Sequence, residues 1–230
     1  MDDSPSSQHS GLDLNRIDII SDAICPWCYI GKRQLERALP ELAAQGLTFD
    51  IHWNPFQLNP DMPAEGRDRA GYRIEKFGSP QRAAELDAHM TATAAGVGLE
   101  FHLDRLIRTP NTVAAHRVIL LADAEGVQDA VVEALMDAYF CQGADIGDAD
   151  TLAAIAGTAG LPAASVLAML ASDQGLETVL RGDAMARRAG ISGVPSFALA
   201  GHVLFSGAYP AEQMVANFAQ AHKTLGSRAA

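Results

Sequence analysis

The residues best suited to chemistry in this chain are two cysteines in the segment Cys25-Pro26-Trp27-Cys28. A dithiol catalyst needs one thiol that ionises readily and a second thiol close enough to attack the mixed disulfide that the first one forms. The first turn of a helix meets both needs, because its unpaired N–H groups and partial positive charge stabilise a thiolate. We therefore predict a redox pair in which Cys25 is the nucleophile and Cys28 is the resolving thiol.

The same pair could instead bind a metal or form a purely structural disulfide. A structural zinc site takes four ligands, usually from a second cysteine pair or from histidines. The only further cysteine is Cys141, and no other Cys or His stands near it in the sequence. A disulfide that closes a two-residue loop would constrain little of the chain. Redox chemistry is the favoured interpretation, and we predict no metal site.

Short elements on either side of the pair would hold it in place. Residues 16–21 form an apolar, β-branched run that is typical of a buried strand. Apolar residues then recur at helical spacing from Cys28 to near Gly46, and Pro26 is suited to the first helical turn. Residues 47–53 alternate between apolar and polar types, as a strand does. The N-terminal segment thus predicts a strand, the cysteine pair, a helix and a second strand.

The middle of the chain has a different character. Alanine is abundant there, strand-like patterns are nearly absent, and Gly or Pro separates stretches with helical periodicity. We predict helices over residues 67–77, 81–95, 111–125, 127–139, 149–158 and 163–171. A further helix over residues 174–189 leads into two short strands, 197–200 and 203–205, and a last helix over 210–221.

Without its helical middle, the chain has the element order of a thioredoxin-type sheet. We predict an α/β thioredoxin-like fold with a large inserted all-helical domain. The predicted boundaries are a flexible N-terminal tail over residues 1–14, a thioredoxin-like domain over 15–59 and 173–226, and the inserted helical domain over 60–172.

Val194-Pro195 stands between the long C-terminal helix and the strand that follows it. In thioredoxin-type sites a proline at this point has a cis peptide bond and lies against the cysteine pair. The residue before it keeps its backbone groups free to pair with an extended substrate segment. The alternative is a trans proline that simply enters a strand. We predict a cis bond and assign Pro195 to the catalytic site.

Several segments together resemble the DsbA family, and more narrowly its FrnE-like branch. The resemblance extends over residues 15 to 222 and is carried by residues 21–39, 53–63, 110–112 with 115–117, 138–140 with 143–146, and 190–197. It implies a thioredoxin fold with a helical insertion and disulfide exchange on peptide, protein or small dithiol substrates. It also implies Cys25 as nucleophile, Cys28 as resolving thiol and Pro195 as the cis-proline.

The residues that could contact substrate are Pro26 and Trp27 between the cysteines, Val194, Phe56 after the second strand, and Asn111. For Phe56 the alternative is packing between the domains. Asn111 could face the cysteine pair across the domain cleft or cap the helix that follows it. For Cys141 we expect a buried, inert thiol.

The bulk composition limits the partners. The 230 residues are 48% hydrophobic and carry a net charge of −11, with no basic stripe that would bind nucleic acid or a membrane surface. Neither a secretory signal nor an apolar stretch of about 18 residues is visible, so we expect a cytoplasmic protein. We expect no tightly bound cofactor, with glutathione as a candidate redox partner alongside a cellular reductant or oxidant.

Two other functions fit parts of the sequence. Kappa-type glutathione transferases and 2-hydroxychromene-2-carboxylate isomerases resemble this architecture, but they usually lack the second thiol that this chain keeps as Cys28. A non-catalytic, chaperone-like module that binds partners through the helical domain is the second alternative. Oxidase, reductase and isomerase directions are equally open.

Overall fold

A four-stranded sheet in the order β2-β1-β5-β6 forms the centre of the protein. The computed structural model describes residues 12–229, so the predicted tail over residues 1–14 lies mostly outside the described residues. β1 is parallel to β2 and antiparallel to β5, and β5 is antiparallel to β6. The four strands are β1 (Arg16–Ser21), β2 (Asp50–Pro55), β5 (Ser196–Leu199) and β6 (His202–Ser206).

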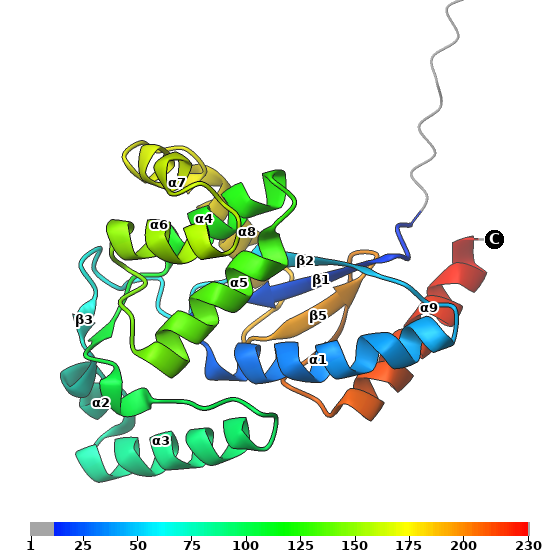
Figure 1. The fold of residues 1–230 in the computed structure, drawn as a ribbon. Helices are drawn as coiled ribbons and strands as arrows, with labels where there is room; N and C mark the ends of the chain where they lie inside the picture. The colour runs from blue at the N-terminus through cyan, green and yellow to red at the C-terminus, as the bar shows by residue number, and fades with distance from the viewer. Residues whose placement is uncertain (1–11, 230) are drawn as a thin grey trace, which may run out of the picture.

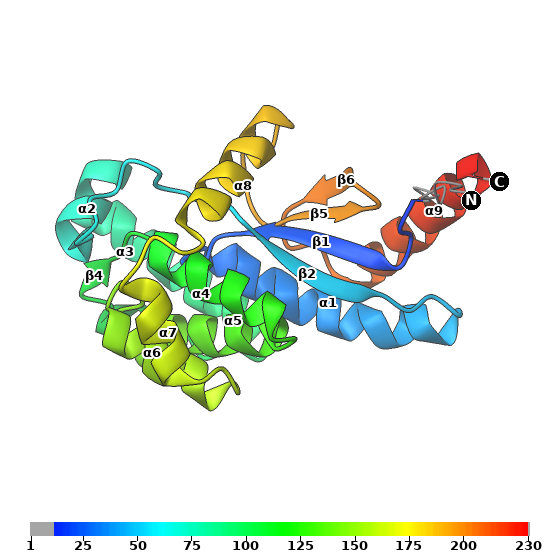
Figure 2. The ribbon, with the colours of Figure 1, turned by 90° about the horizontal axis from the view of Figure 1, so that it is seen from above.

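Helices cover both faces of this sheet. α1 (Pro26–Ala44) and α9 (Ala211–Ala229) lie side by side on one face, and α8 (Leu176–Arg188) lies on the other (Figure 2). Both central strands are therefore buried, and Ile17, Ile19 and Phe197 are each 0% exposed. Burial on both faces explains why residues 16–21 form an apolar run rather than an alternating one.

The chain between β2 and α8 is mostly helical and forms the left part of the molecule in Figure 1. It contains one small two-stranded sheet, β3 (Arg67–Asp68) with β4 (Arg108–Thr109). Its helices are α2 (Arg69–Phe77), α3 (Pro80–Ala95), a short 3₁₀ turn (Leu103–Arg105), α4 (Val113–Ala124), α5 (Gln128–Asp137), a π-helical turn (Ala138–Gln142), α6 (Ala149–Thr158) and α7 (Ala163–Leu170).

The helical segment is fastened to the exposed edge of β2 by α5. The side-chain amide of Gln128 accepts a hydrogen bond from the Trp53 N–H at 2.9 Å and donates one to the Trp53 carbonyl at 3.0 Å. The Trp53 indole donates to Asp129 at 2.9 Å. Without Gln128, the backbone N–H and carbonyl of Trp53 at the edge of the sheet would have no hydrogen-bond partner in a neighbouring strand. The edge of β2 is therefore also the place where the helical segment binds to the sheet.

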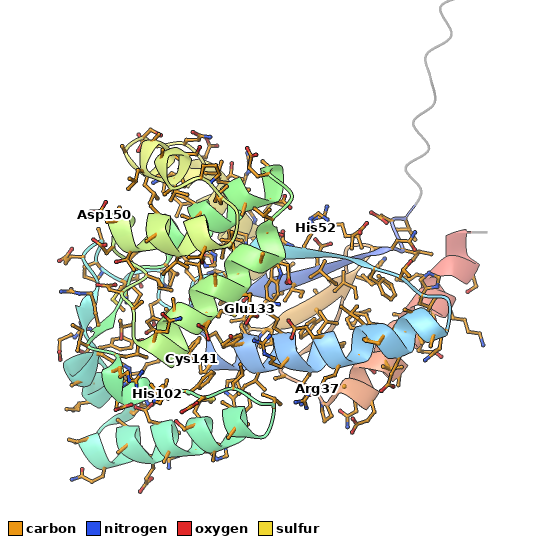
Figure 3. All side chains as sticks on the ribbon, in the orientation of Figure 1. Arg37, His52, His102, Glu133, Cys141 and Asp150 are labelled. Carbon is orange, nitrogen blue, oxygen red and sulfur yellow. The ribbon has the colours of Figure 1, made fainter. Side chains whose placement is uncertain are left out.

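A second contact joins α5 to α1. The Lys32 ammonium, 3% exposed, lies within 3.3 Å of carboxylate oxygens of Glu36, Asp129 and Glu133. Glu133 also pairs with Arg33 and accepts a hydrogen bond from Tyr29 at 2.7 Å. Figure 3 shows Glu133 between α5 and α1. This ionic cluster lies one helical turn behind the cysteine pair.

Several predicted elements begin or end elsewhere in the structure. The last helix, predicted over 210–221, spans Ala211–Ala229, and most other ends differ by one or two residues. The helix predicted from residue 67 begins at Arg69, because the Asp68 side chain caps it by accepting from the Gly71 N–H. The strand predicted over 47–53 spans Asp50–Pro55, in register with β1. The helix predicted to run through residue 139 changes to a π-helical turn at Ala138, which ends where Gly143 has a φ of 79°.

The predicted fold class, a thioredoxin-like fold with a helical insertion, is confirmed. The domain boundaries at residues 60 and 172 stay a prediction. None of the helices within residues 12–229 combines the length and hydrophobicity that a membrane span requires.

Candidate active site

The cysteine pair lies at the N-terminus of α1. Cys25 is the N-cap residue, Pro26 takes the first helical position, and the Cys28 N–H donates to the Cys25 carbonyl at 3.0 Å. Pro26 fits there because the first helical N–H has no partner within the helix. Both thiols are free, with Cys25 3% exposed and Cys28 1% exposed. The order of residues therefore places both sulfur atoms on the first turn, as the motif predicts.

Cys28 is held in its protonated form. Burial raises the pKa of Cys28 well above its usual value, and the neighbouring Cys25 adds to the rise through a hydrogen bond and its charge. The Ser21 hydroxyl and the Asp22 backbone oppose this rise more weakly. Burial and the neighbouring Cys25 therefore both favour the protonated form of Cys28.

The Val194–Pro195 loop supplies the other side of the site. Its peptide bond is cis, as the sequence predicts. The Cys25 thiol donates to the Val194 carbonyl at 3.4 Å, although the two residues are 169 positions apart. The Pro195 carbonyl accepts from the Gly207 N–H at 2.7 Å, which ties the loop to the segment after β6. The fold therefore brings Cys25, Cys28 and Pro195 together.

A buried carboxylate below the pair is a feature that the sequence interpretation missed. Asp22 is 0% exposed and accepts a hydrogen bond from the Leu58 N–H at 2.7 Å. The second oxygen of its carboxylate lies 3.5 Å from Nε2 of His116, which also contacts the Phe56 carbonyl at 3.1 Å. An Asp three residues before a redox cysteine was the available signal, whereas its partner His116 comes from the distant helix α4.

Two of the five predicted substrate-binding residues line a cavity beside the pair. Pro26 and Trp27, together with Ile24, border a cavity of about 340 Å³ that extends to α2 and α3. Trp27 is 37% exposed. Val194 contacts Cys25 through its carbonyl group instead.

The structure places the other two predicted contact residues away from that cavity. Phe56 is 2% exposed and packs with Ile20, Ile191 and Ala198. The prediction that it lines a substrate groove is therefore corrected, because a side chain buried between β1 and the β5 region cannot reach a ligand. Asn111 instead accepts from the Val113 N–H and donates to the Met62 carbonyl, so it fixes the start of α4 rather than facing the cysteines.

Cys141 is half-buried rather than buried. Partial burial raises the pKa of its thiol to about 12, and the charge and hydrogen bonding of Asp137 add to the effect. Among residues 12–229, no three His, Cys, Asp or Glu side chains form a cluster that could hold a metal ion.

Comparisons with known proteins agree with this geometry. The family model described as the DSBA-like thioredoxin domain matches residues 16–219. A crystal structure of a probable DsbA oxidoreductase from Streptomyces coelicolor is 30% identical and covers 92% of this chain and 90% of its own, with a TM-score of 0.80.

Two more distant structures share the fold alone. A 2-hydroxychromene-2-carboxylate isomerase is 17% identical, covers 93% of this chain and 98% of its own, and has a TM-score of 0.64. The cytosolic disulfide reductase DsbM from Pseudomonas aeruginosa, solved with GSH, is also 17% identical over the same shares of the two chains, with a TM-score of 0.60.

A sheet flanked by helices, with a cysteine pair facing a cis-proline loop, defines a thioredoxin-fold protein of the disulfide-exchange class. This chain belongs to the DsbA-like thioredoxin-domain family of thiol–disulfide oxidoreductases. The narrower FrnE-like assignment stays a prediction.

Proposed function

We propose that this protein exchanges disulfides through Cys25 and Cys28, with the Val194–Pro195 loop as the surface that receives the substrate. The observation that carries the proposal is the 3.4 Å contact between the Cys25 sulfur and the Val194 carbonyl at the N-terminus of α1. A reacting sulfur at a helix N-terminus, beside backbone groups that can pair with an extended chain, is what the exchange reaction requires.

The reaction takes place in two displacements. The Cys25 thiolate attacks one sulfur of a substrate disulfide, so that a Cys25–substrate bond forms while the other half leaves as a thiolate. Cys28 then loses its proton and attacks Cys25, which releases the second half and forms the Cys25–Cys28 disulfide. Two electrons pass from the protein dithiol to the substrate, and the two substrate thiolates take up the protons. Oxidation of a substrate dithiol is the reverse sequence.

The proposed substrates are thiol- or disulfide-containing peptides, proteins or small dithiols. We propose no tightly bound cofactor and glutathione as the redox partner that returns the pair to its starting state. Membership of the DsbA-like family supports the substrate class. The structure of DsbM with GSH makes glutathione the first partner to test.

A trapping experiment tests the roles of the two thiols. Cys28→Ser should accumulate mixed disulfides at Cys25, visible by mass spectrometry after incubation with a reduced and reoxidised peptide. Cys25→Ser should form none, and Cys141→Ser should behave as the unchanged protein. Absence of any mixed disulfide in Cys28→Ser would count against the proposal.

Replacing Cys28 by alanine and assaying the unchanged protein separate the competing functions. A glutathione transferase or isomerase would keep its activity in Cys28→Ala, since it needs one thiol at most, whereas disulfide exchange would be lost. A binding module would fail both an insulin-reduction and a scrambled-ribonuclease assay even in its unchanged form.

A further inference from the structure

The cavity beside Trp27 has a size and position that the proposed exchange reaction leaves unexplained. It measures about 340 Å³, within the range of small-molecule sites. One side is formed by Ile24, Pro26 and Trp27, the residues that flank Cys25. The other side is formed by α2 and α3. α2 lies beyond the N-terminal end of α1 in Figures 1 and 2, and α3 runs below that end in Figure 1. A molecule bound there would contact the residues on both sides of Cys25 in the sequence.

The wall formed by α2 is cationic. Arg69, Arg73 and Lys76 all line the cavity from one face of this helix. Asp87 of α3 is the only carboxylate among the described residues that line it. Arg69 contacts both oxygens of Asp87 at 3.0 Å, and Arg73 contacts one at 2.6 Å. One carboxylate thus serves two guanidinium groups, and the wall keeps an excess of positive charge in a chain whose net charge is −11.

Lys76 has no acidic partner within residues 12–229. Its ammonium donates to the Tyr72 hydroxyl at 2.8 Å and to the Asn59 side-chain oxygen at 3.4 Å. Tyr72 in turn donates to Asn59 at 2.5 Å. Neutral partners hold the ammonium at the cavity without cancelling its charge, which is how a protein keeps a cation available for an anionic ligand.

Arg73 supports the same conclusion. Its side chain is 17% exposed, and its Nε–H has no hydrogen-bond partner in the described part of the chain. Burial lowers the pKa of Arg73, and the charge of Arg69 lowers it further despite the opposing effect of Asp87. Arg69 and Arg73 share the single carboxylate of Asp87, so a second anion would stabilise the two guanidinium groups further.

Most of the rest of the lining is apolar. The apolar side chains away from the cysteine pair include Phe77, Leu86, Met90, Leu103, Leu106 and Phe140, and the polar side chains of His89, Thr109 and Tyr139 also line the cavity there. An apolar cavity with a few convergent charged groups is the usual form of a small-molecule site, in which the polar groups fix the orientation. The volume suits one ring or short aliphatic chain, and not a folded protein segment.

We propose that this cavity binds one half of a small disulfide that combines an apolar ring or chain with a carboxylate. The inference rests on the proposed function and names a substrate class for it. The carboxylate of the ligand faces Arg69, Arg73 and Lys76, and its apolar part lies against the apolar side chains that line the cavity. The substrate sulfur then meets Cys25, which bonds to it as the other half leaves as a thiolate. Cys28 displaces the bound half, which departs as the second thiol.

Kinetics with two aromatic disulfides test the charge preference. Dithiobis(nitrobenzoate) carries a carboxylate on each ring, whereas dithiodipyridine carries none. The measured quantity is the second-order rate constant for dithiobis(nitrobenzoate) divided by that for dithiodipyridine. Relative to the unchanged protein, this ratio should fall about twofold to fivefold in Lys76→Gln and about tenfold in Arg73→Gln. Comparing ratios across variants cancels the intrinsic reactivity of each reagent and any effect on Cys25 itself. The same ratio should fall as ionic strength rises.

Arg82→Gln on α3 is the matched control. It removes an exposed cation that does not line the cavity and should leave the ratio unchanged. If folded Lys76→Gln and Arg73→Gln both keep the ratio of the unchanged protein, the cavity does not select anions and the inference is overturned, while the exchange reaction stands. A fall of the same size in Arg82→Gln would also overturn it.

Binding of an unreactive probe separates this inference from the exchange reaction. Nitrobenzoate should quench the fluorescence of Trp27 at concentrations at which nitrobenzamide does not, and Lys76→Gln should weaken that quenching. This result would hold even in a protein that reacted with neither disulfide, which would refute the proposed function alone. Equal quenching by the acid and the amide would refute the anion site.

Discussion

Gly31 brings the backbone of α1 against the ring of Pro195. A Cβ atom at residue 31 would lie 3.0 Å from Cγ of Pro195, closer than ordinary van der Waals contact. The absence of a side chain at this one helical position therefore sets how closely the cysteine helix and the Val194–Pro195 loop can approach.

Gly31→Ala should slow disulfide exchange by about fivefold to tenfold, because small displacements of reacting groups reduce rates strongly. The Pro195 ring must move by a few tenths of an ångström, and the Val194 carbonyl moves with it. Stopped-flow measurement of the reaction with a neutral disulfide gives the rate. Gly157→Ala in α6, where the nearest atom to a new Cβ is 3.8 Å away, is the control and should react at the normal rate.

His116 should matter for stability. Its Nε2 lies 3.1 Å from the Phe56 carbonyl oxygen and 3.5 Å from one oxygen of the buried Asp22 carboxylate, a position from which its N–H can donate. His116→Ala leaves both acceptors buried without that donor, which should lower the free energy of unfolding by about 1–3 kcal/mol. Urea denaturation followed by circular dichroism measures the change. An unchanged midpoint, equal to that of the exposed-site control His202→Ala, would show that this contact contributes nothing.

Cys141 should resist alkylation in the folded protein. With a pKa of about 12, its thiolate is so scarce at pH 8 that iodoacetamide should react about a thousandfold more slowly than with a free cysteine. Peptide mass spectrometry after timed labelling gives the rate. Labelling in urea should restore ordinary reactivity, since the burial and the nearby Asp137 carboxylate are then lost. Equal rates in both conditions would contradict the assigned environment.

Glu133 should make stability depend on acid pH. Burial by itself raises the pKa of Glu133, but hydrogen bonds from Arg33 and Tyr29 and the charge of Lys32 outweigh it, so the net pKa is lowered. A lowered pKa means that the folded state binds the proton less readily than the unfolded state. The stabilisation is therefore complete above the unfolded value of about 4.3 and is lost as the pH falls through the lower folded value.

Glu133→Gln tests this linkage. The variant should be less stable than the unchanged protein at neutral pH, and the difference should shrink below about pH 4. Urea midpoints measured from about pH 6 to about pH 3 give the two curves. Glu125→Gln, at an exposed position at the C-terminus of α4, is the control. Its urea midpoint should change with pH in the same way as that of the unchanged protein. A constant difference between Glu133→Gln and the unchanged protein across this range would refute the linkage.

Local patterns predicted the elements that touch the cysteine pair. The apolar run of β1, Pro26 at the start of α1 and the Val194-Pro195 dipeptide each carry their information within a few residues. The fold class and the meeting of Cys25 with Pro195 followed from their order along the chain. Boundaries were less accurate where a single side chain decides them, as the Asp68 cap does for α2.

The rest of the site depends on contacts between distant segments. Phe56 and Asn111 were placed by sequence neighbourhood, but packing against Ile191 and bonding to Met62 decide where they lie. The Asp22–His116 contact needs α4 to lie beside the β1–α1 loop, and the cavity needs α2 to face Trp27. Hydrophobic periodicity does not reveal contacts between distant segments. It shows which face of a helix is buried, but it does not show which other element packs against that face.

The distance in sequence between Cys25 and Val194 has a consequence for how the protein is made. Ribosomes add about 5–20 residues per second, so the 169 positions between them take about 10–30 s to synthesise. During that interval the nascent chain carries both thiols without the loop against which they work. The finished site is among the last parts of the fold to form, and an oxidant or thiol that meets the growing chain meets a cysteine pair whose surroundings are still incomplete.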